Sequence, residues 1–390
     1  MCYCFQITVC SGFGGGSMSK VNLCDICDFQ GGSQPPKSQW TTLQQDGYIR
    51  MLQIRDFTQP GKVKAEYVKL TNTTKCCLKD DILIARYGAS LGKILTGLSG
   101  AYNVAMTKAV PNEAVISKKF LYYFLCSDTF QNCILNVGVR AAQAGFNKED
   151  LSNIELYCPD LSIQNKICKI LELVDVLVNK SKLQLDELDL LVKSRFIEMF
   201  GLLLTQEKAV TLENLISQNI ITYHLDGNHG GLYPKADEFV RTGVPYLGAN
   251  AIIDGRIDFK KAKFLTERKA SILRKGIAQN GDVLFAHNAT VGPVAILKTD
   301  YKKVIVSTSL TVYRCNNRRI LPVFIKYFME SEFFVNQYKK DMKQTTRNQV
   351  PITHQKKFMF IVPPIELQNQ FADFVAQVDK SKFVVTAKFQ

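Results

Sequence analysis

Four polar segments carry the side chains that could do chemistry. They are ARYGASLGK (85–93) and NVGVRAAQAGFNK (136–148) in the first half of the chain, and AHNATVGP (286–293) and DMKQTTRNQVP (341–351) in the second. Arginine and lysine can donate to guanine, asparagine and glutamine pair with adenine, and serine or threonine can contact either base. These types predict contacts to nucleic-acid bases, although solvated loops without a ligand would carry the same residues. The candidates are Arg86, Lys93, Arg140, Gln143 and Asn147 in the first half, and His287, Asn288, Gln344, Thr345, Arg347 and Asn348 in the second.

Other patterns fall short of a catalytic or metal site. The run Gly88–Lys93 resembles a phosphate-binding loop, but it is one residue short between its glycines and has no serine or threonine after the lysine. Cys24 and Cys27 have the spacing of a metal-binding pair, yet no second pair follows at a useful distance. No HExxH motif and no Asn-Pro-Pro-aromatic methyltransferase signature occurs. We therefore expect no catalytic residue, no metal and no cofactor in this chain.

The charge balance favours a polyanionic partner. The 390 residues include 49 Lys and Arg against 35 Asp and Glu, a formal charge of +14, while 46% are hydrophobic and 22% charged. This composition is typical of globular proteins and excludes a disordered chain. No run of about 18 apolar residues predicts a membrane span, and the first 20 residues lack the features of a signal peptide. Eleven of the twelve cysteines precede residue 170 at irregular spacing, which indicates reduced thiols and a cytoplasmic protein.

The second half of the chain repeats the first. The segment 80–94 aligns with 281–295, and 120–130 aligns with 324–334. From residue 120 onwards the matched residue numbers differ by 204, and a constant offset over such a length predicts two related domains rather than an array of small repeats. The matched pairs are Asp81/Asp282, Ala85/Ala286, Gly92/Gly292, Phe120/Phe324, Tyr123/Tyr327, Phe124/Phe328, Ser127/Ser331, Phe130/Phe334, Pro159/Pro363, Gln164/Gln368, Asn165/Asn369 and Asp175/Asp379.

Both halves predict the same order of elements. A loop rich in Gly and Pro comes first, short strands follow, and then an aromatic helix, a polar loop, an apolar run and a helix that begins after a proline. The expected strands are 81–85, 282–286 and 304–314, the aromatic helices 118–130 and 322–334, and the apolar runs 153–159 and 357–364.

The segment from Ser162 to about Phe200 predicts a long helix. It contains no Pro or Gly, and Gly201 could end it. At 1.5 Å per residue the helix would span roughly 55–60 Å. Its apolar residues recur at heptad spacing, which favours pairing with another helix, the candidate being the one that starts near Ile365; an ordinary core helix is the alternative. The seam residues are Ile167, Leu171, Val174, Val178, Leu185, Leu188, Val192 and Met199.

This order, occurring twice, resembles the specificity subunit of type I restriction-modification systems. The likeness covers almost all of residues 20–382, and the proline-to-glutamine junction before each closing helix is its most discriminating part. The residues that carry it are DDILIARYGASLGK and GDVLFAHNATVGP, VPPIELQNQFADFVAQVDKSK (362–382), CPDLSIQNKICKILELVD (158–175) and SRFIEMFG (194–201).

The resemblance implies an α+β fold with two similar mixed α/β target-recognition domains, separated by long coiled-coil helices that are expected to be antiparallel. It implies a non-catalytic chain that reads a split, asymmetric site on double-stranded DNA, while its helices dock methyltransferase subunits, with endonuclease (translocase) subunits as further partners and no membrane. The expected parts are an unusual N-terminal segment (1–20), the first recognition domain (21–160), a central spacer helix (161–200), the second recognition domain (205–363) and a shortened spacer helix (364–390).

Two alternatives remain open at the level of the sequence. One is a self-contained nuclease or methyltransferase with its own recognition domains, against which stands the lack of a catalytic constellation. The other is an orphan DNA-binding protein, for example an inactive or recombination-donor copy of a specificity subunit. Co-purification with a methyltransferase subunit discriminates between this second alternative and the full complex.

Overall fold

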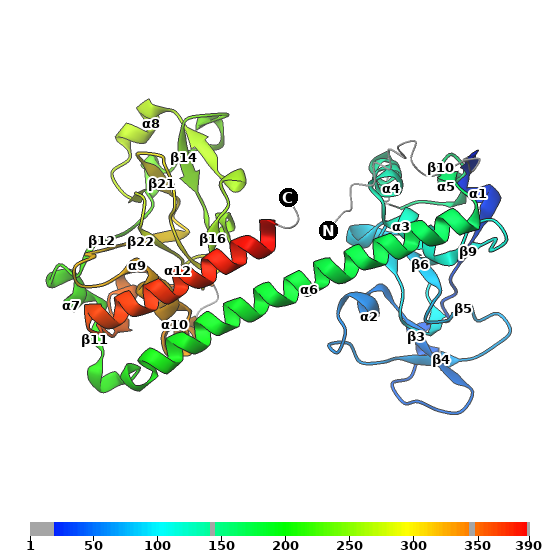
Figure 1. Cartoon of the computed structure of the whole chain (residues 1–390), viewed down its shortest axis with the longest axis horizontal. Helices are drawn as coiled ribbons and strands as arrows, with labels where there is room; N and C mark the ends of the chain where they lie inside the picture. The colour runs from blue at the N-terminus through cyan, green and yellow to red at the C-terminus, as the bar shows by residue number, and fades with distance from the viewer. Residues whose placement is uncertain (1–18, 141–144, 343–347, 388–390) are drawn as a thin grey trace. The chain divides into compact units, whose positions relative to one another are not determined.

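The computed structural model describes residues 19–140, 145–342 and 348–387. The chain divides into two compact units, unit 1 (Met1–Val178) and unit 2 (Asn179–Gln390), and the division falls inside one long helix. Figure 1 labels many of the helices and strands of both units. Each unit is described below by itself.

Unit 1 is built on two four-stranded sheets. The first, in the order β2-β9-β6-β7, is antiparallel, and the second, β4-β3-β8-β5, contains the parallel pair β3–β8. The helices and strands of the unit are β1 (Ser19–Asn22), α1 (Leu23–Ile26), β2 (Cys27–Gly31), β3 (Tyr48–Leu52), α2 (Ile54–Thr58), β4 (Tyr67–Lys69), β5 (Cys76–Cys77), β6 (Ile82–Ala85), β7 (Ile94–Leu95), β8 (Gly100–Tyr102), β9 (Met106–Pro111), α3 (Lys118–Cys126), α4 (Asp128–Arg140), α5 (Lys148–Leu151), β10 (Glu155–Cys158) and the first part of α6 (Leu161–Phe200).

Unit 2 repeats this plan. Its antiparallel sheet has the order β12-β22-β19-β20, and a five-stranded sheet, β13-β17-β14-β21-β18, again contains one parallel pair, β14–β21. The helices and strands after α6 are β11 (Val210–Thr211), α7 (Leu212–Ser217), β12 (Ile221–Asp226), β13 (Phe239–Val240), β14 (Val244–Leu247), β15 (Ile252–Ile253), β16 (Arg256–Ile257), β17 (Lys263–Leu265), α8 (Glu267–Ile272), β18 (Ile277–Ala278), β19 (Val283–Ala286), β20 (Val294–Ile296), β21 (Val304–Val306), β22 (Leu310–Cys315), α9 (Pro322–Glu330), α10 (Glu332–Met342), α11 (Ile352–Gln355), β23 (Met359–Phe360) and α12 (Ile365–Ala387).

The repeat expected from the sequence is confirmed at the level of register. Ile82 of β6 lies opposite Ala109 of β9, and Val283 of β19 lies opposite Tyr313 of β22, so the aligned residues occupy the same places in the two antiparallel sheets. Strands β6 and β19 are buried along their whole length. A strand covered on both faces reads as a continuous apolar run, which is why ILIA and VLFA do not alternate with polar residues.

Two expected elements differ from the structure. The run 304–314 forms two strands in different sheets, because the chain turns at Ser307, where the Leu310 N–H bonds to the Ser307 carbonyl. The aromatic helices 118–130 and 322–334 are each broken into two, at Ser127 and Ser331, whose backbones are extended. Each serine hydroxyl donates back to the helix that ends there, at 2.6 Å, and accepts from the helix that begins. A serine that bonds to its own backbone neighbours in this way favours a cap over a helix interior.

A buried glutamine attaches each closing helix to its unit. Gln164, near the start of α6, is fully buried; its Oε1 accepts from the Ser117 N–H, and its Nε2 donates to the carbonyls of Val115 and Pro159, all at 2.8 Å. Because three backbone groups depend on one amide, the start of the helix is tied to the loop before α3. In unit 2 the aligned set is Gln368 with Leu321 (2.8 Å), Pro363 (2.8 Å) and Arg319 (3.2 Å).

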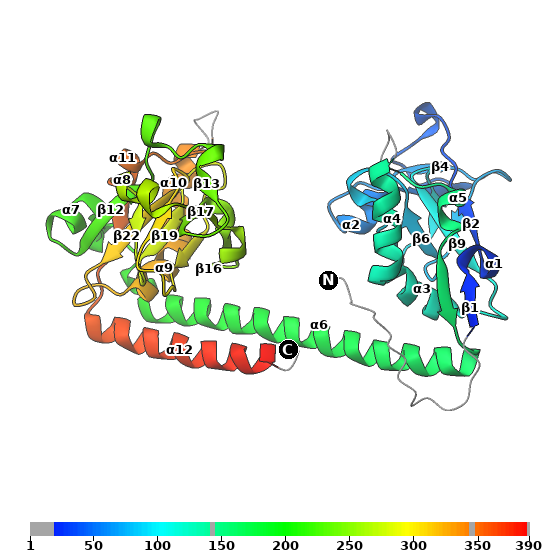
Figure 2. The same ribbon diagram turned by 90° about the horizontal axis from the view of Figure 1, so that it is seen from above.

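Helix α12 runs antiparallel to the second half of α6 within unit 2 (Figure 2). Phe371 of α12 packs edge-on against Phe196 and Phe200 of α6, with ring centroids 5.4 and 5.6 Å apart. Further along α12, Lys382 forms an ion pair with Asp189 of α6. The later α12 residue thus meets the earlier α6 residue, as an antiparallel pair requires.

The predicted seam of α6 is divided between two cores. Ile167 and Leu171 pack against the core of unit 1, whereas Leu188, Val192 and Met199 pack against the core of unit 2. Between them Val174 is 38% exposed, and Val178 and Leu185 are half-buried. The seam residues near the two ends of α6 thus belong to two different cores, and the three between them are partly exposed. Its most buried aromatic residues, Phe196 and Phe200, lie outside the predicted heptad positions.

Candidate nucleic-acid interface

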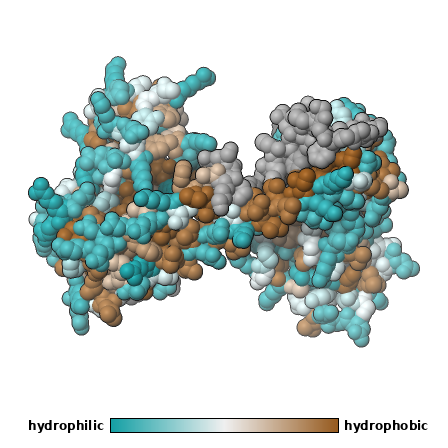
Figure 3. Space-filling view, in the orientation of Figure 1, coloured by the Kyte–Doolittle hydropathy of each residue, from teal (hydrophilic) through white to brown (hydrophobic). Residues whose placement is uncertain are grey.

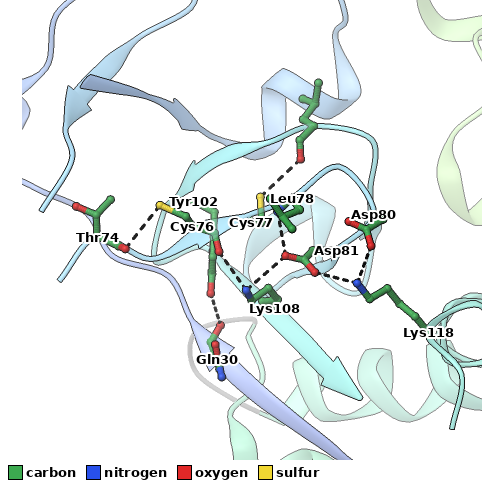
Figure 4. Close-up of polar contacts among 11 residues, drawn as sticks. Gln30, Thr74, Cys76, Cys77, Leu78, Asp80, Asp81, Tyr102, Lys108 and Lys118 are labelled. Carbon is green, nitrogen blue, oxygen red and sulfur yellow. Dashed lines mark hydrogen bonds and ion pairs between the residues drawn. The ribbon is translucent and has the colours of Figure 1, made fainter. Parts of the chain in front are cut away.

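One candidate loop in each unit follows a strand, β6 or β19, and an aspartate just before that strand fixes its start. Asp81 accepts from the Leu78 N–H at 2.9 Å and pairs with Lys108 and Lys118, as Figure 4 shows. Burial alone would raise the pKa of Asp81, but the Leu78 N–H and the lysines outweigh it and hold the pKa below its ordinary value. Both lysines are engaged in these ion pairs, which makes them poor candidates for contacts to DNA.

Asp282 holds the matching strand end of unit 2. Its carboxylate accepts from the Gln279 N–H at 2.9 Å and from Nε and Nη2 of Arg314 at 2.9 and 2.8 Å. The exposed fraction of the Asp282 side chain is 2%, so the carboxylate of this bidentate ion pair is buried. The guanidinium of Arg314 is therefore engaged within the fold. The opposite end of β19 leads into the candidate loop.

The structure brings the two candidate loops of unit 1 together. Tyr87 forms an isolated β-bridge with Gly145, and the Phe146 N–H donates to the Arg86 carbonyl at 3.4 Å. Gly145 is needed here, since a Cβ at this position would lie 2.4 Å from Cδ1 of Tyr87. The segment after β6 and the segment before α5 therefore meet at the end of one strand.

The loops of unit 2 meet in the same way. The segment after β19 and the segment before α11 share an isolated β-bridge and two further backbone hydrogen bonds, so the arrangement recurs at the aligned positions. These contacts are Asn288 with Gln349, the Ala289 N–H to the Asn348 carbonyl (3.0 Å), and the Val350 N–H to the His287 carbonyl (2.8 Å).

The candidates of unit 1 differ in what they can offer a ligand. Arg86 is half-buried, with Nε and Nη2 each 3.4 Å from the Phe146 carbonyl and its guanidinium over the Tyr87 ring. Lys93 is exposed. Asn147 is exposed but caps α5, where its Oδ1 accepts from the Asp150 N–H at 3.0 Å. The side chain of Arg140, the last residue of α4, and all of Gln143 lie outside the described residues.

In unit 2 the sharpest departure from expectation is His287. Its side chain is 1% exposed, and Nδ1 lies 3.0 Å from the Val350 carbonyl, so the ring is buried out of reach of a duplex. Burial lowers its pKa and keeps the ring neutral. Asn288 is half-buried and Asn348 is exposed, both at the junction of the loops. Gln344, Thr345 and Arg347 lie outside the described residues.

The sequence did not point to the buried polar network beneath this junction. Gln355 is fully buried; its Oε1 accepts from the Tyr313 hydroxyl at 2.7 Å and lies 3.2 Å from Nε2 of His224. Its Nε2 donates to Thr311 Oγ1 at 3.0 Å and to the Val350 carbonyl at 3.1 Å. The only signal in the sequence was a lone glutamine in a short, otherwise unremarkable helix.

The family model described as "Type I restriction modification DNA specificity domain" matches residues 17–190 and 224–388. The two matches coincide with the two copies of the repeat and cover most of the chain. This chain belongs to that family. As a family member it carries two restriction-modification target-recognition domains and a long helix that fits the coiled-coil linker of the fold.

Individual relatives agree with this assignment. The chain is 23% identical over 350 residues to the type I restriction enzyme MjaVIII specificity subunit of Methanocaldococcus jannaschii, covering 86% of this chain and 80% of the relative. The fold is similar to the S subunit of a type I restriction-modification system from M. genitalium, with a TM-score of 0.50, 15% identity and coverage of 96% and 93%. A solved chain from a study of assembly and conformational transition of the type I R-M system gives a TM-score of 0.50 at 16% identity, covering 95% and 91%.

Three further observations concern the described part of this specificity-family chain. No group of three or more His, Cys, Asp or Glu side chains within it is arranged to hold a metal ion. Its nine cysteines are free thiols, and burial raises the pKa of Cys27 to about 12, so this thiol stays protonated. None of its helices is both long and apolar enough to cross a bilayer.

Proposed function

We propose that this chain is the DNA specificity subunit of a type I restriction-modification complex and that each unit reads one half of a split, asymmetric site. The observation that carries the proposal is the paired loops. In both units the two segments with base-contacting residue types meet at the end of the same strand, on antiparallel sheets that share strand order and register. Equal frames with different loops are what two different half-sites require.

Affinity and specificity would come from different residues. The formal charge of +14 supplies the sequence-independent attraction to phosphates. Base discrimination would fall to the loop residues, each good bidentate contact contributing about 1–3 kcal/mol. Among the described candidates, Lys93 and Asn348 are exposed and their side chains make no contact with the scaffold. The other candidates stay predictions from the sequence: Arg140, Gln143, Gln344, Thr345 and Arg347.

We place the docking surface for methyltransferase subunits on α6. Four apolar side chains recur every seven residues on one face of this helix: Val176 (62% exposed), Leu183 (63%), Leu190 (63%) and Ile197 (52%). Figure 3 shows apolar surface along α6. Exposed apolar patches of this kind mark interaction sites in soluble proteins. Endonuclease subunits would join through the assembled complex, and catalysis would belong to the partners.

Methylome sequencing of cells with and without this chain tests the proposal. A split motif that is methylated only when the chain is present would support it, and the spacing of the two halves would follow from the same data. Unchanged methylation, together with failure of the tagged chain to co-purify a methyltransferase subunit, would favour an orphan copy. Methyl transfer by the purified chain alone would instead revive a self-contained enzyme.

A further inference from the structure

In both units a side chain from the first candidate loop contacts a backbone carbonyl near the end of the second. In unit 1 this is the Phe146 carbonyl, and the group that faces it is the guanidinium of Arg86. In unit 2 it is the Val350 carbonyl, and the group is Nδ1 of His287. Phe146 and Val350 are aligned by the repeat, and Arg86 and His287 each follow the matched alanine that ends β6 or β19.

The chemistry of this contact is the same although the residues differ. A backbone carbonyl only accepts, so the arginine and the histidine must both act as donors. For His287 this fixes the proton on Nδ1, and Nε2 is buried without a partner. A neutral imidazole with this tautomer satisfies the site, whereas a second proton would have nowhere to bond.

Unit 2 reinforces the contact and unit 1 does not. The Val350 carbonyl also accepts from Gln355, which is held by Tyr313 and His224. The residues in the same places of unit 1 are Leu151, Ala109 and Phe29, all members of its apolar core. The contact between the side chain and the carbonyl therefore occurs in both units. The residues beneath it are polar in unit 2 and apolar in unit 1.

We propose that Arg86 and His287 are positioning residues that hook the two recognition loops of their unit together and so fix where the base-contacting side chains lie. The inference rests on the proposed function. Among the described residues of the two loops, the other hydrogen bonds that join them are the few backbone bonds given above, so this side-chain contact adds substantially to the junction. Neither residue needs to touch DNA itself, which accounts for a 1% exposed side chain at the start of a candidate recognition loop.

The test compares His287→Asn with His287→Leu in the full-length chain. Asparagine keeps a donor close to the place of Nδ1, whereas leucine has a similar size and no donor. Purified proteins are used to select from random-sequence DNA duplexes, and the bound pool is sequenced. We expect His287→Leu to lose base preference in one half of the selected motif and His287→Asn to keep it. Arg86→Met should relax the opposite half, with Arg86→Lys as its donor-retaining control.

Hydrogen exchange supplies a readout that does not depend on DNA. The Val350 amide donates to the His287 carbonyl, so loss of the hook should speed exchange over residues 348–350 about fivefold in His287→Leu, the equivalent of one net hydrogen bond. The exchange of β19 and β22 should stay unchanged. His287→Asn should match the wild type in both segments.

The outcomes separate the two proposals. If His287→Leu leaves both exchange and base preference unchanged, the hook is overturned. It is equally overturned if both halves of the motif relax together with faster exchange throughout unit 2, since the residue is then merely part of the core. A wild-type chain that enriches no sequence contradicts the proposed function and with it any role in base reading, while exchange still decides whether the side chain holds the loop.

Discussion

At the residue scale, a single buried glutamine attaches the closing helix to each unit. Gln164 and Gln368 are separated by 204 residues, yet they bond to aligned backbone groups in the two units. A buried amide that satisfies three backbone groups is hard to replace, because any apolar residue leaves those groups without partners. The glutamine of the proline-to-glutamine junction seen in the sequence therefore serves to tie the helix to the preceding loop.

We predict that Gln164→Leu lowers the free energy of unfolding of unit 1 by about 2–4 kcal/mol, because buried carbonyl and N–H groups lose their partner. Urea denaturation followed by the fluorescence of Trp40, the only tryptophan, measures this directly. Asn165→Leu is the matched control on the next, exposed residue and should change stability by less than about 0.5 kcal/mol. Equal effects of the two substitutions would contradict the assigned role.

A second prediction concerns pH. Burial lowers the pKa of His224 to about 4, so the folded state keeps the ring neutral while the unfolded chain takes up a proton near pH 6.5. The contribution of His224 to the free energy of unfolding is therefore fully present above about pH 6.5 and is lost as the pH drops towards 4. Between pH 7 and 5 this group alone lowers the free energy of unfolding by about 2 kcal/mol.

His224→Phe is the control, because Phe29 occupies the same place in unit 1. Urea unfolding of both proteins at pH 7 and 5, followed by circular dichroism, should show the smaller pH dependence in the variant. The Trp40 signal provides an internal reference, since all four histidines follow residue 178 and unit 1 has none. A variant with the full wild-type pH dependence would refute the assignment.

At the element scale, α6 has two faces that differ in burial. Val192 is 1% exposed and lies in the core of unit 2, whereas Leu183 and Leu190 are each 63% exposed on the same helix. Leu171, a residue of the predicted seam, packs against the core of unit 1. Substitutions along this helix should therefore separate folding from assembly.

We predict that Leu183→Asp and Leu190→Asp change the free energy of unfolding by less than about 0.5 kcal/mol but reduce co-purification of the methyltransferase subunit. Val192→Ala should instead cost about 2 kcal/mol of stability, because it opens a cavity in the core. Chemical denaturation and affinity capture of the full chain distinguish the two classes. If the aspartate variants still capture the partner fully, the docking surface lies elsewhere.

At the scale of the whole molecule, two units of one plan would read two independent sequences. Arg140 and Arg347 belong to the second candidate loop of unit 1 and unit 2, respectively. We predict that Arg140→Ala and Arg347→Ala each weaken recognition of a different half-site by about 1–3 kcal/mol, with additive effects in the double variant.

Binding to duplexes that carry changes in one half-site or the other measures this. Uniform weakening on all sequences, with a smaller dependence of affinity on salt, would make these arginines phosphate contacts instead. Weakening of the same half-site by both substitutions would contradict the assignment of one half to each unit.

The sequence by itself determined what depends on local pattern and on comparison of its own halves. The structure confirms the repeat, the strands β6 and β19 and the long helix α6 at Leu161–Phe200. Continuous apolar runs and identical residues at equal spacing can be recognised without knowledge of distant contacts.

Only the tertiary structure decided which residues face which neighbour. It placed His287 in the interior, broke the aromatic helices at Ser127 and Ser331, and divided the seam of α6 between two cores. A histidine in a polar loop has the same local pattern whether it faces solvent or a carbonyl 63 residues away. Burial depends on such long-range contacts, and these are set by packing rather than by the spacing of residues along the chain.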